Sequence, residues 1–134
     1  MKVSKLILPT VSVFVLVFIY GYVVHGVLLA DIYQQTPHLW RTCEDMHSYF
    51  PVMLVSEFGF ALILTLFYAY LQEMMRIPLK GWHYGLGIGA TFAAIQFGLY
   101  AYMPISLHLS LAWVTDALVE PVLCGVLLSC LYKK

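Results

Sequence analysis

The sequence predicts an all-α integral membrane protein, a bundle of four transmembrane helices. Hydrophobic residues make up 62% of its 134 residues, and charged residues make up only 10%. A soluble domain usually has about a quarter charged residues, so this chain has too few polar side chains to cover a surface that faces water. We therefore expect one transmembrane domain over residues 1–134, with the lipid bilayer as its surroundings.

Four apolar stretches reach the length of about 20 residues that a helix needs to cross the hydrocarbon core. Backbone groups in lipid must find hydrogen-bond partners within their own segment, which favours helices. Pro51, Pro78 and Pro104 fall at the expected boundaries, where the missing N–H of a proline costs little. The expected spans are residues 6–30, 51–71, 81–103 and 106–131.

The basic residues predict the orientation. Arg41 lies between the first and second expected spans, and every other Lys or Arg lies where four crossings would place it on the opposite side. Because cytoplasmic loops carry an excess of Lys and Arg, we expect both termini in the cytoplasm. The cytoplasmic residues would be Lys2, Lys5, Arg76, Lys80, Lys133 and Lys134.

The first outer loop, residues 31–50, predicts a short amphipathic helix in the membrane interface. Thr36 and Pro37 are suited to the N-cap and the first position of a helix. Apolar residues then recur at helical spacing, and we interpret the helix as a cover for the bundle. Trp40 and Arg41 are its candidate residues for the outer interface.

Small residues recur every fourth position along the third expected span. Such a row lets another helix approach closely, since helices in lipid associate through packing. We favour packing against a neighbouring span, with dimerisation as the alternative. The residues are Gly81, Gly85, Gly89 and Ala93.

Polar side chains on all four expected spans lie in roughly one region, with three of them in one outer layer, Asp116 slightly deeper and Glu120 near the midplane of the membrane. Ionisable groups in a span are costly and usually face the bundle interior or a wet cavity. Bringing the groups together would satisfy them at the lowest cost. We therefore predict an intramembrane polar cluster of His25, Glu57, Gln96, Asp116 and Glu120. Because Pro121 follows Glu120, we also expect a kink there and a freed carbonyl group at Ala117.

Four interpretations of this cluster remain open. The one we favour is a neutral hydrogen-bonded network that fixes the packing of the helices. The carboxyl groups could instead form a proton or ion path. His25 and the carboxyl groups could bind a metal ion, or His25 could be an axial ligand of haem or a pigment. No sequence motif requires a cofactor.

Nucleic acid is an unsuitable partner, because the net charge is zero and the basic residues do not cluster. The chain also lacks the motifs of known catalytic sites, so we expect no enzymatic activity. Our favoured hypothesis is an accessory or structural subunit that packs against a larger membrane complex or against copies of itself. The alternatives are an ion conduit and a cofactor-binding or metal-binding subunit.

Several short runs resemble a group of short uncharacterised bacterial membrane proteins. The most specific part extends from His25 to Arg41, and thinner similarity continues through residues 84–89 (YGLGIG) to Trp113 and residues 131–133 (LYK). The resemblance implies a bacterial inner-membrane protein with four spans, and it implies no reaction. It suggests that His25 and the pair Trp40 and Arg41 are important.

Overall fold

The computed structural model describes residues 4–77 and 79–132, and this part of the chain is helical with no β-strand. The all-α prediction is therefore confirmed. The elements are α1 (Ser4–Gly21), the π-helix η1 (Tyr22–Leu28), α2 (Ala30–Tyr33), the 3₁₀ helix η2 (Pro37–Leu39), α3 (Cys43–Glu73), α4 (Gly81–Leu99) and α5 (Leu107–Leu131). Four residues used in the sequence predictions, Lys2, Pro78, Lys133 and Lys134, lie outside the described residues.

Within the described ranges, three helical segments are long and apolar enough to cross a membrane. They are Ser4–Leu28, Cys43–Glu73 and Leu107–Leu131. The helix α4 has 19 residues and is not among them. Its first turn carries Trp82, His83 and Tyr84, which are polar or amphipathic and lower its mean hydropathy.

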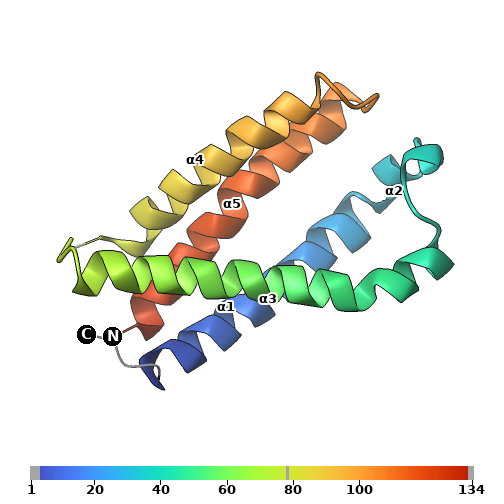
Figure 1. The fold of residues 1–134 in the computed structure, drawn as a ribbon. Coiled ribbons are helices and arrows are strands. Elements are labelled where there is room, and N and C mark those ends of the chain that lie inside the picture. Colours follow the sequence, from blue (N-terminus) through green and yellow to red (C-terminus); the bar gives the residue numbers. More distant parts are fainter. Residues whose placement is uncertain (1–3, 78, 133–134) are drawn as a thin grey trace.

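The helices form two pairs, α1 with α3 and α4 with α5, and α1 also contacts α5. Figure 1 shows that α1 begins, α3 ends, α4 begins and α5 ends at the same end of the molecule, which we call the terminal end. The short helix α2 and the connection between α4 and α5 lie at the opposite end, the distal end. The helix α3 crosses α1 near its middle and diverges from α4 and α5 towards its own first residue (Figure 1).

The helices α4 and α5 touch backbone to backbone. The small residues of α4 that are buried are Gly81, Gly85, Gly89 and Ala93. A Cβ atom at Gly85 would overlap the backbone of Pro121 on α5, and one at Gly89 would lie 2.9 Å from the carbonyl oxygen of Ala117. Glycine is therefore needed at these positions for the close approach. The row of small residues forms an interface within the chain.

The terminal end is closed by tyrosine side chains. The Tyr84 hydroxyl donates to the carbonyl oxygen of Leu64 on α3 at 2.8 Å, which joins the two helix pairs. The ring of Tyr68 packs edge-on against the rings of Tyr84 and Tyr132, at centroid distances of 5.2 and 6.1 Å. The Tyr132 hydroxyl donates to Glu73 at the end of α3.

The prediction of a separate interfacial helix in the outer loop was wrong. Pro37 starts only a three-residue 3₁₀ helix, and the longer helix begins at Cys43, where the side chain of Thr42 accepts a hydrogen bond from the N–H of Asp45 at 3.2 Å. Because this cap starts the helix two turns early, residues 43–50 continue directly into the second expected span. Pro51 lies inside α3 rather than at its start, and Figure 1 shows the first turns of α3 bent relative to the rest.

The first and third expected spans also differ from the structure near the distal end. The helix α1 changes at Tyr22 into the π-helix η1. The N–H of Leu29 donates to the carbonyl oxygen of Val24, five residues earlier, at 2.9 Å, which is the hydrogen-bond pattern of a π-helix. The helix α4 ends at Leu99, four residues before the expected boundary. By contrast, α5 runs through Pro121 as one helix from its N-cap Ser106, whose side chain accepts from the N–H of Leu109.

Candidate functional site

The structure places the five polar residues of the predicted cluster around one pocket with a volume of about 310 Å³. Each of α3, α4 and η1 contributes one of them, and α5 contributes two. The remaining walls are mainly small or aromatic. The polar residues of the predicted cluster are His25, Glu57, Gln96, Asp116 and Glu120. The other residues that line the pocket are Val17, Gly21, Ser56, Phe60, Phe92, Ala117 and Pro121.

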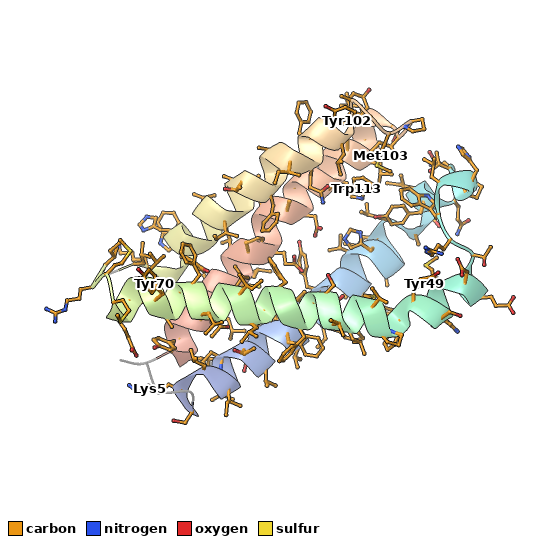
Figure 2. The ribbon with its side chains drawn as sticks, in the orientation of Figure 1. Lys5, Tyr49, Tyr70, Tyr102, Met103 and Trp113 are labelled. Carbon is orange, nitrogen blue, oxygen red and sulfur yellow. The ribbon has the colours of Figure 1, made fainter. Side chains whose placement is uncertain are left out.

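His25 lies at the distal side of this pocket and connects two elements. Its Nε2 atom lies 3.3 Å from Oδ2 of Asp116, and its Nδ1 atom lies 2.7 Å from the hydroxyl of Tyr33. The indole N–H of Trp113 donates to the same hydroxyl at 2.9 Å. Figure 2 shows Trp113 on the part of α5 near α2. One chain of contacts therefore runs from Trp113 through Tyr33 and His25 to Asp116.

The partners of Tyr33 define which nitrogen of His25 carries the proton when the ring is neutral. An indole N–H can only donate, so the Tyr33 oxygen accepts from Trp113 and its own O–H is available for Nδ1 of His25. The proton of a neutral His25 then lies on Nε2, where it faces the Asp116 carboxylate. The network thus orients the imidazole towards the carboxylate.

Tyr33 is held in place by aromatic neighbours. The indole N–H of Trp40 donates to the backbone carbonyl of Tyr33 and to the side chain of Thr36, each at 3.2 Å. The rings of Trp40 and Trp113 pack edge-on at a centroid distance of 6.0 Å. Burial raises the pKa of the Tyr33 phenol above its ordinary value, so the hydroxyl stays protonated and able to donate at neutral pH.

The carboxyl groups of the pocket have few partners. Oε2 of Glu57 and Oδ1 of Asp116 are buried and make no direct hydrogen bond within the described residues, although the phenol of Tyr20 on α1 lies close enough to the Asp116 carboxyl group to interact with it. Glu120 lies one turn from Asp116 on α5 and within electrostatic range of Glu57, Asp116 and His25. Three carboxyl groups therefore share the pocket with one histidine. A buried carboxylate oxygen without a partner is unstable, so the site favours an added proton or cation.

The helix α5 positions both of its carboxyl groups through its contact with α4. Asp116 and Glu120 precede Ala117 and Pro121, which lie on the face that touches the glycine row. The carbonyl of Ala117, which Pro121 deprives of its helical donor, faces Gly89 across this contact. The tight packing of α4 and α5 therefore fixes the wall of the pocket from which the two carboxyl groups project.

The two cofactor interpretations receive no support from this geometry. Both ring nitrogens of His25 have partners, so ligation of haem or a metal ion would require one of those contacts to break. In the ranges 4–77 and 79–132, no group of three or more His, Cys, Asp or Glu side chains converges as a metal site would require. The pocket is wider than a coordination sphere.

Of the two predicted residues of the outer interface, Trp40 belongs to the aromatic cluster and Arg41 faces away from it. The Arg41 guanidinium pairs with Asp45 at 2.8 Å and lies 3.8 Å from the centre of the Tyr49 ring. Figure 2 shows Tyr49 on the first turns of α3, apart from Trp113. Arg41 therefore has no direct contact with the pocket.

Sequence reasoning missed Tyr33 and Trp113 as partners of His25. Tyr33 lies eight residues after His25, beyond a π-helix and a break at Leu29, so no helical periodicity relates the two. Trp113 lies one turn before Asp116 on the same helix, which is a relation that the sequence does contain. The aromatic wall formed by Phe60 and Phe92 was missed as well, because nothing distinguishes these residues from ordinary apolar positions.

No protein-family model, curated protein or solved structure matches this chain.

Proposed function

We propose that the protein is a membrane protein with four spans whose pocket binds and passes on protons or small cations. The observation that carries the proposal is the meeting of polar side chains from four helical elements around one pocket, with buried oxygens of Glu57 and Asp116 left without hydrogen-bond partners. A network that served only to fix helix packing would be expected to satisfy its own members. The network in this pocket instead leaves two carboxyl oxygens without a hydrogen bond, and a proton or a cation could bind to them.

The proposed topology has both termini and the connection between α3 and α4 in the cytoplasm of a bacterial cell, with the protein in the inner membrane. Its support is the distribution of Lys and Arg in the sequence together with the common location of these segments at the terminal end. The pocket would then lie nearer the outer face. The glycine row of α4 is buried against α5, and with this face covered its lower hydropathy is compatible with a crossing segment.

The chemistry expected of the site follows from its charges. His25 neutralises one carboxylate when it is protonated, and the other carboxyl groups then depend on protons or on an incoming cation. The chain from Trp113 to Asp116 orients His25 so that a proton on Nε2 is directed at Asp116. An incoming cation would compete with the Nε2–H group of His25 for the Asp116 carboxylate, since both are attracted to the same oxygen atoms.

Flux through reconstituted liposomes tests the proposal. We expect Asp116→Asn and Glu120→Gln each to lower proton or cation flux about tenfold or more, because each removes a charge in the pocket. Glu44→Gln is the matched control, since Glu44 is an exposed carboxylate on the first turn of α3. Unchanged flux in both pocket variants, measured with protein that elutes normally in size-exclusion chromatography, would falsify the proposal.

An accessory subunit is the second candidate. Several large apolar side chains on the distal half of α3 are exposed, including Tyr49, Phe50, Val52 and Val55. A partner protein in the membrane would pack against these exposed side chains. Native-gel migration of gently solubilised protein distinguishes the candidates, because a subunit of a larger complex migrates with its partner, whereas a free monomer that conducts ions in liposomes supports the first proposal.

A further inference from the structure

We infer that the pocket takes a small organic ammonium ion, with apolar substituents on a single positive charge, in preference to an inorganic cation. This inference rests on the proposed function and adds the class of ligand. It follows from three properties of the pocket, namely its size, the composition of its walls and its charge.

The pocket is too large for a dehydrated metal ion. Its volume of about 310 Å³ lies at the lower end of the range of about 300–1,000 Å³ that is usual for small-molecule sites. A selective site for a metal ion would need ligands that converge within about 2–2.6 Å of one point. Throughout the ranges that the structure describes, no three acidic, histidine or cysteine side chains converge in this way.

Two phenylalanine rings form part of the wall, one from α3 and one from α4. Phe60 and Phe92 meet edge-on with their centroids 5.8 Å apart. Aromatic faces attract organic cations, and the attraction increases when water is excluded. Val17, Gly21 and Pro121 supply further apolar surface. A hydrated inorganic ion would gain little from these walls, whereas apolar substituents on an ammonium ion would be buried against them.

The charge of the pocket selects a cation over a neutral molecule or an anion. Glu57, Asp116 and Glu120 outnumber the single imidazole of His25. Oε2 of Glu57 has no hydrogen-bond donor to displace among the described residues. An ammonium group placed near these carboxyl groups would supply the missing charge, with its substituents towards Phe60 and Phe92.

Titration calorimetry of the purified full-length protein tests this inference with benzylammonium as the probe. Benzyl alcohol is the neutral control of similar shape, and NaCl and MgCl₂ are the inorganic competitors. We expect saturable binding of benzylammonium alone, which the inorganic salts at equal ionic strength do not displace. Binding of benzyl alcohol with equal affinity, or displacement by sodium ions, would overturn the inference.

Variants locate the ligand. Asp116→Asn should weaken benzylammonium binding about tenfold or more, because it removes a charge partner. Phe60→Leu and Phe92→Leu should each weaken it about threefold, as expected for loss of one cation–π contact that is partly exposed to solvent. Phe97→Leu is the control, since Phe97 is on the same helix as Phe92, is 54% exposed and does not line the pocket. Phe92 is itself 41% exposed, so its variant should fold even if Phe60→Leu does not.

The outcomes separate failure of the inference from failure of the proposed function. If proton flux depends on Asp116 and Glu120 but benzylammonium neither binds nor slows the flux, the proposed function stands and the organic ligand is wrong. If flux is unchanged in both carboxyl variants and benzylammonium does not bind, both proposals are wrong. Binding that is insensitive to Asp116→Asn and to both phenylalanine variants places the ligand elsewhere and also overturns the inference.

Discussion

The terminal and distal ends of the molecule are built in opposite ways. At the terminal end, glycine residues bring α4 against α5, and the Tyr84 hydroxyl donates directly to a backbone carbonyl of α3. At the distal end, α3 diverges from α4 and α5, and the pocket with its polar side chains lies between the helices. The same helical segments therefore form a tightly packed core at one end and, towards the other, a pocket followed by a second apolar cluster around Leu29, Ile105 and Leu109.

This difference shows how a small membrane protein can tolerate buried carboxyl groups. Helices in lipid gain stability from close packing, and the contact between α4 and α5 supplies it where Gly81 and Gly85 lie. The tight contact between α4 and α5 then stabilises the fold, so the helices around the pocket do not need to pack as closely. Asp116 and Glu120 belong to the same helix as Gly125, so one element takes part in both kinds of packing.

The largest effect is expected where the packing is tightest. Gly85→Leu places a side chain where a Cβ atom already overlaps the backbone of Pro121, and we expect a loss of about 3 kcal/mol or more in the free energy of unfolding. Unfolding by sodium dodecyl sulfate in mixed micelles measures this loss. Gly87→Leu is the control, because no heavy atom lies within 4 Å of the Cβ position at Gly87. Equal stability of the two variants would contradict the backbone contact.

A smaller effect is expected from Tyr33→Phe at the distal end. The variant removes the hydroxyl that lies between Trp113 and His25, at a cost of about 1–2 kcal/mol for unpaired polar groups. The Nδ1 atom of the imidazole also loses its hydrogen-bond donor, whereas Asp116 still faces Nε2. Nitrogen-15 NMR of labelled histidine should show the Nε2–H form in both proteins, with the Nδ1 resonance of the variant moved downfield by the loss of its hydrogen bond. An unchanged spectrum would show that Tyr33 does not orient His25.

Replacement of a pocket carboxyl group should lower flux without lowering the free energy of unfolding. Glu57→Gln removes a charge whose Oε2 atom has no donor among the described residues, so we expect the free energy of unfolding to stay within about 1 kcal/mol of the original value or to rise. Flux through liposomes should fall at the same time. Combined measurement of unfolding and flux on one preparation checks both parts. A loss of stability as large as that of Gly85→Leu would mean that Glu57 belongs to the packed core.

An effect that is confined to high pH concerns the terminal end. Burial, together with the hydrogen bond to Glu73, raises the pKa of Tyr132 from 10.0 to about 12. The folded protein therefore keeps this proton between about pH 10 and 12 while the unfolded chain loses it, so stability is complete below pH 10 and decreases as the pH rises to 12. Unfolding measured at several pH values should show this decrease, and Tyr132→Phe should reduce it. An identical pH dependence in the variant would exclude Tyr132 as its source.

The parts of the fold that follow from the sequence are those set by repeated local patterns. Long apolar segments predict helices, and a glycine at every fourth position of residues 81–89 marks the face that α4 presents to α5. Depth along a helix also follows from counting residues, which is why residues as distant as His25 and Asp116 could be assigned to one layer. The structure brings them to the same pocket.

The parts that could not be predicted depend on single local interactions or on the path of the chain. Thr42 starts α3 earlier than expected, although Thr36 followed by proline was the more typical N-terminal pattern. Hydropathy made Pro51 a boundary, yet the helix continues through it. Tyr33 meets His25 only because the chain turns at Leu29. No periodicity in the sequence encodes that turn.

The π-helix at residues 22–28 gives the chain an unusual tolerance of length. Its backbone bonds close over one more residue than those of an α-helix, so deleting a single residue there would let the segment adopt ordinary α-helical bonds. The residues on either side could then keep nearly the same directions around the helix axis, because the turn that loses the residue is the one that held it in excess. The side chains that change direction would be those within the segment itself, and His25 is one of them.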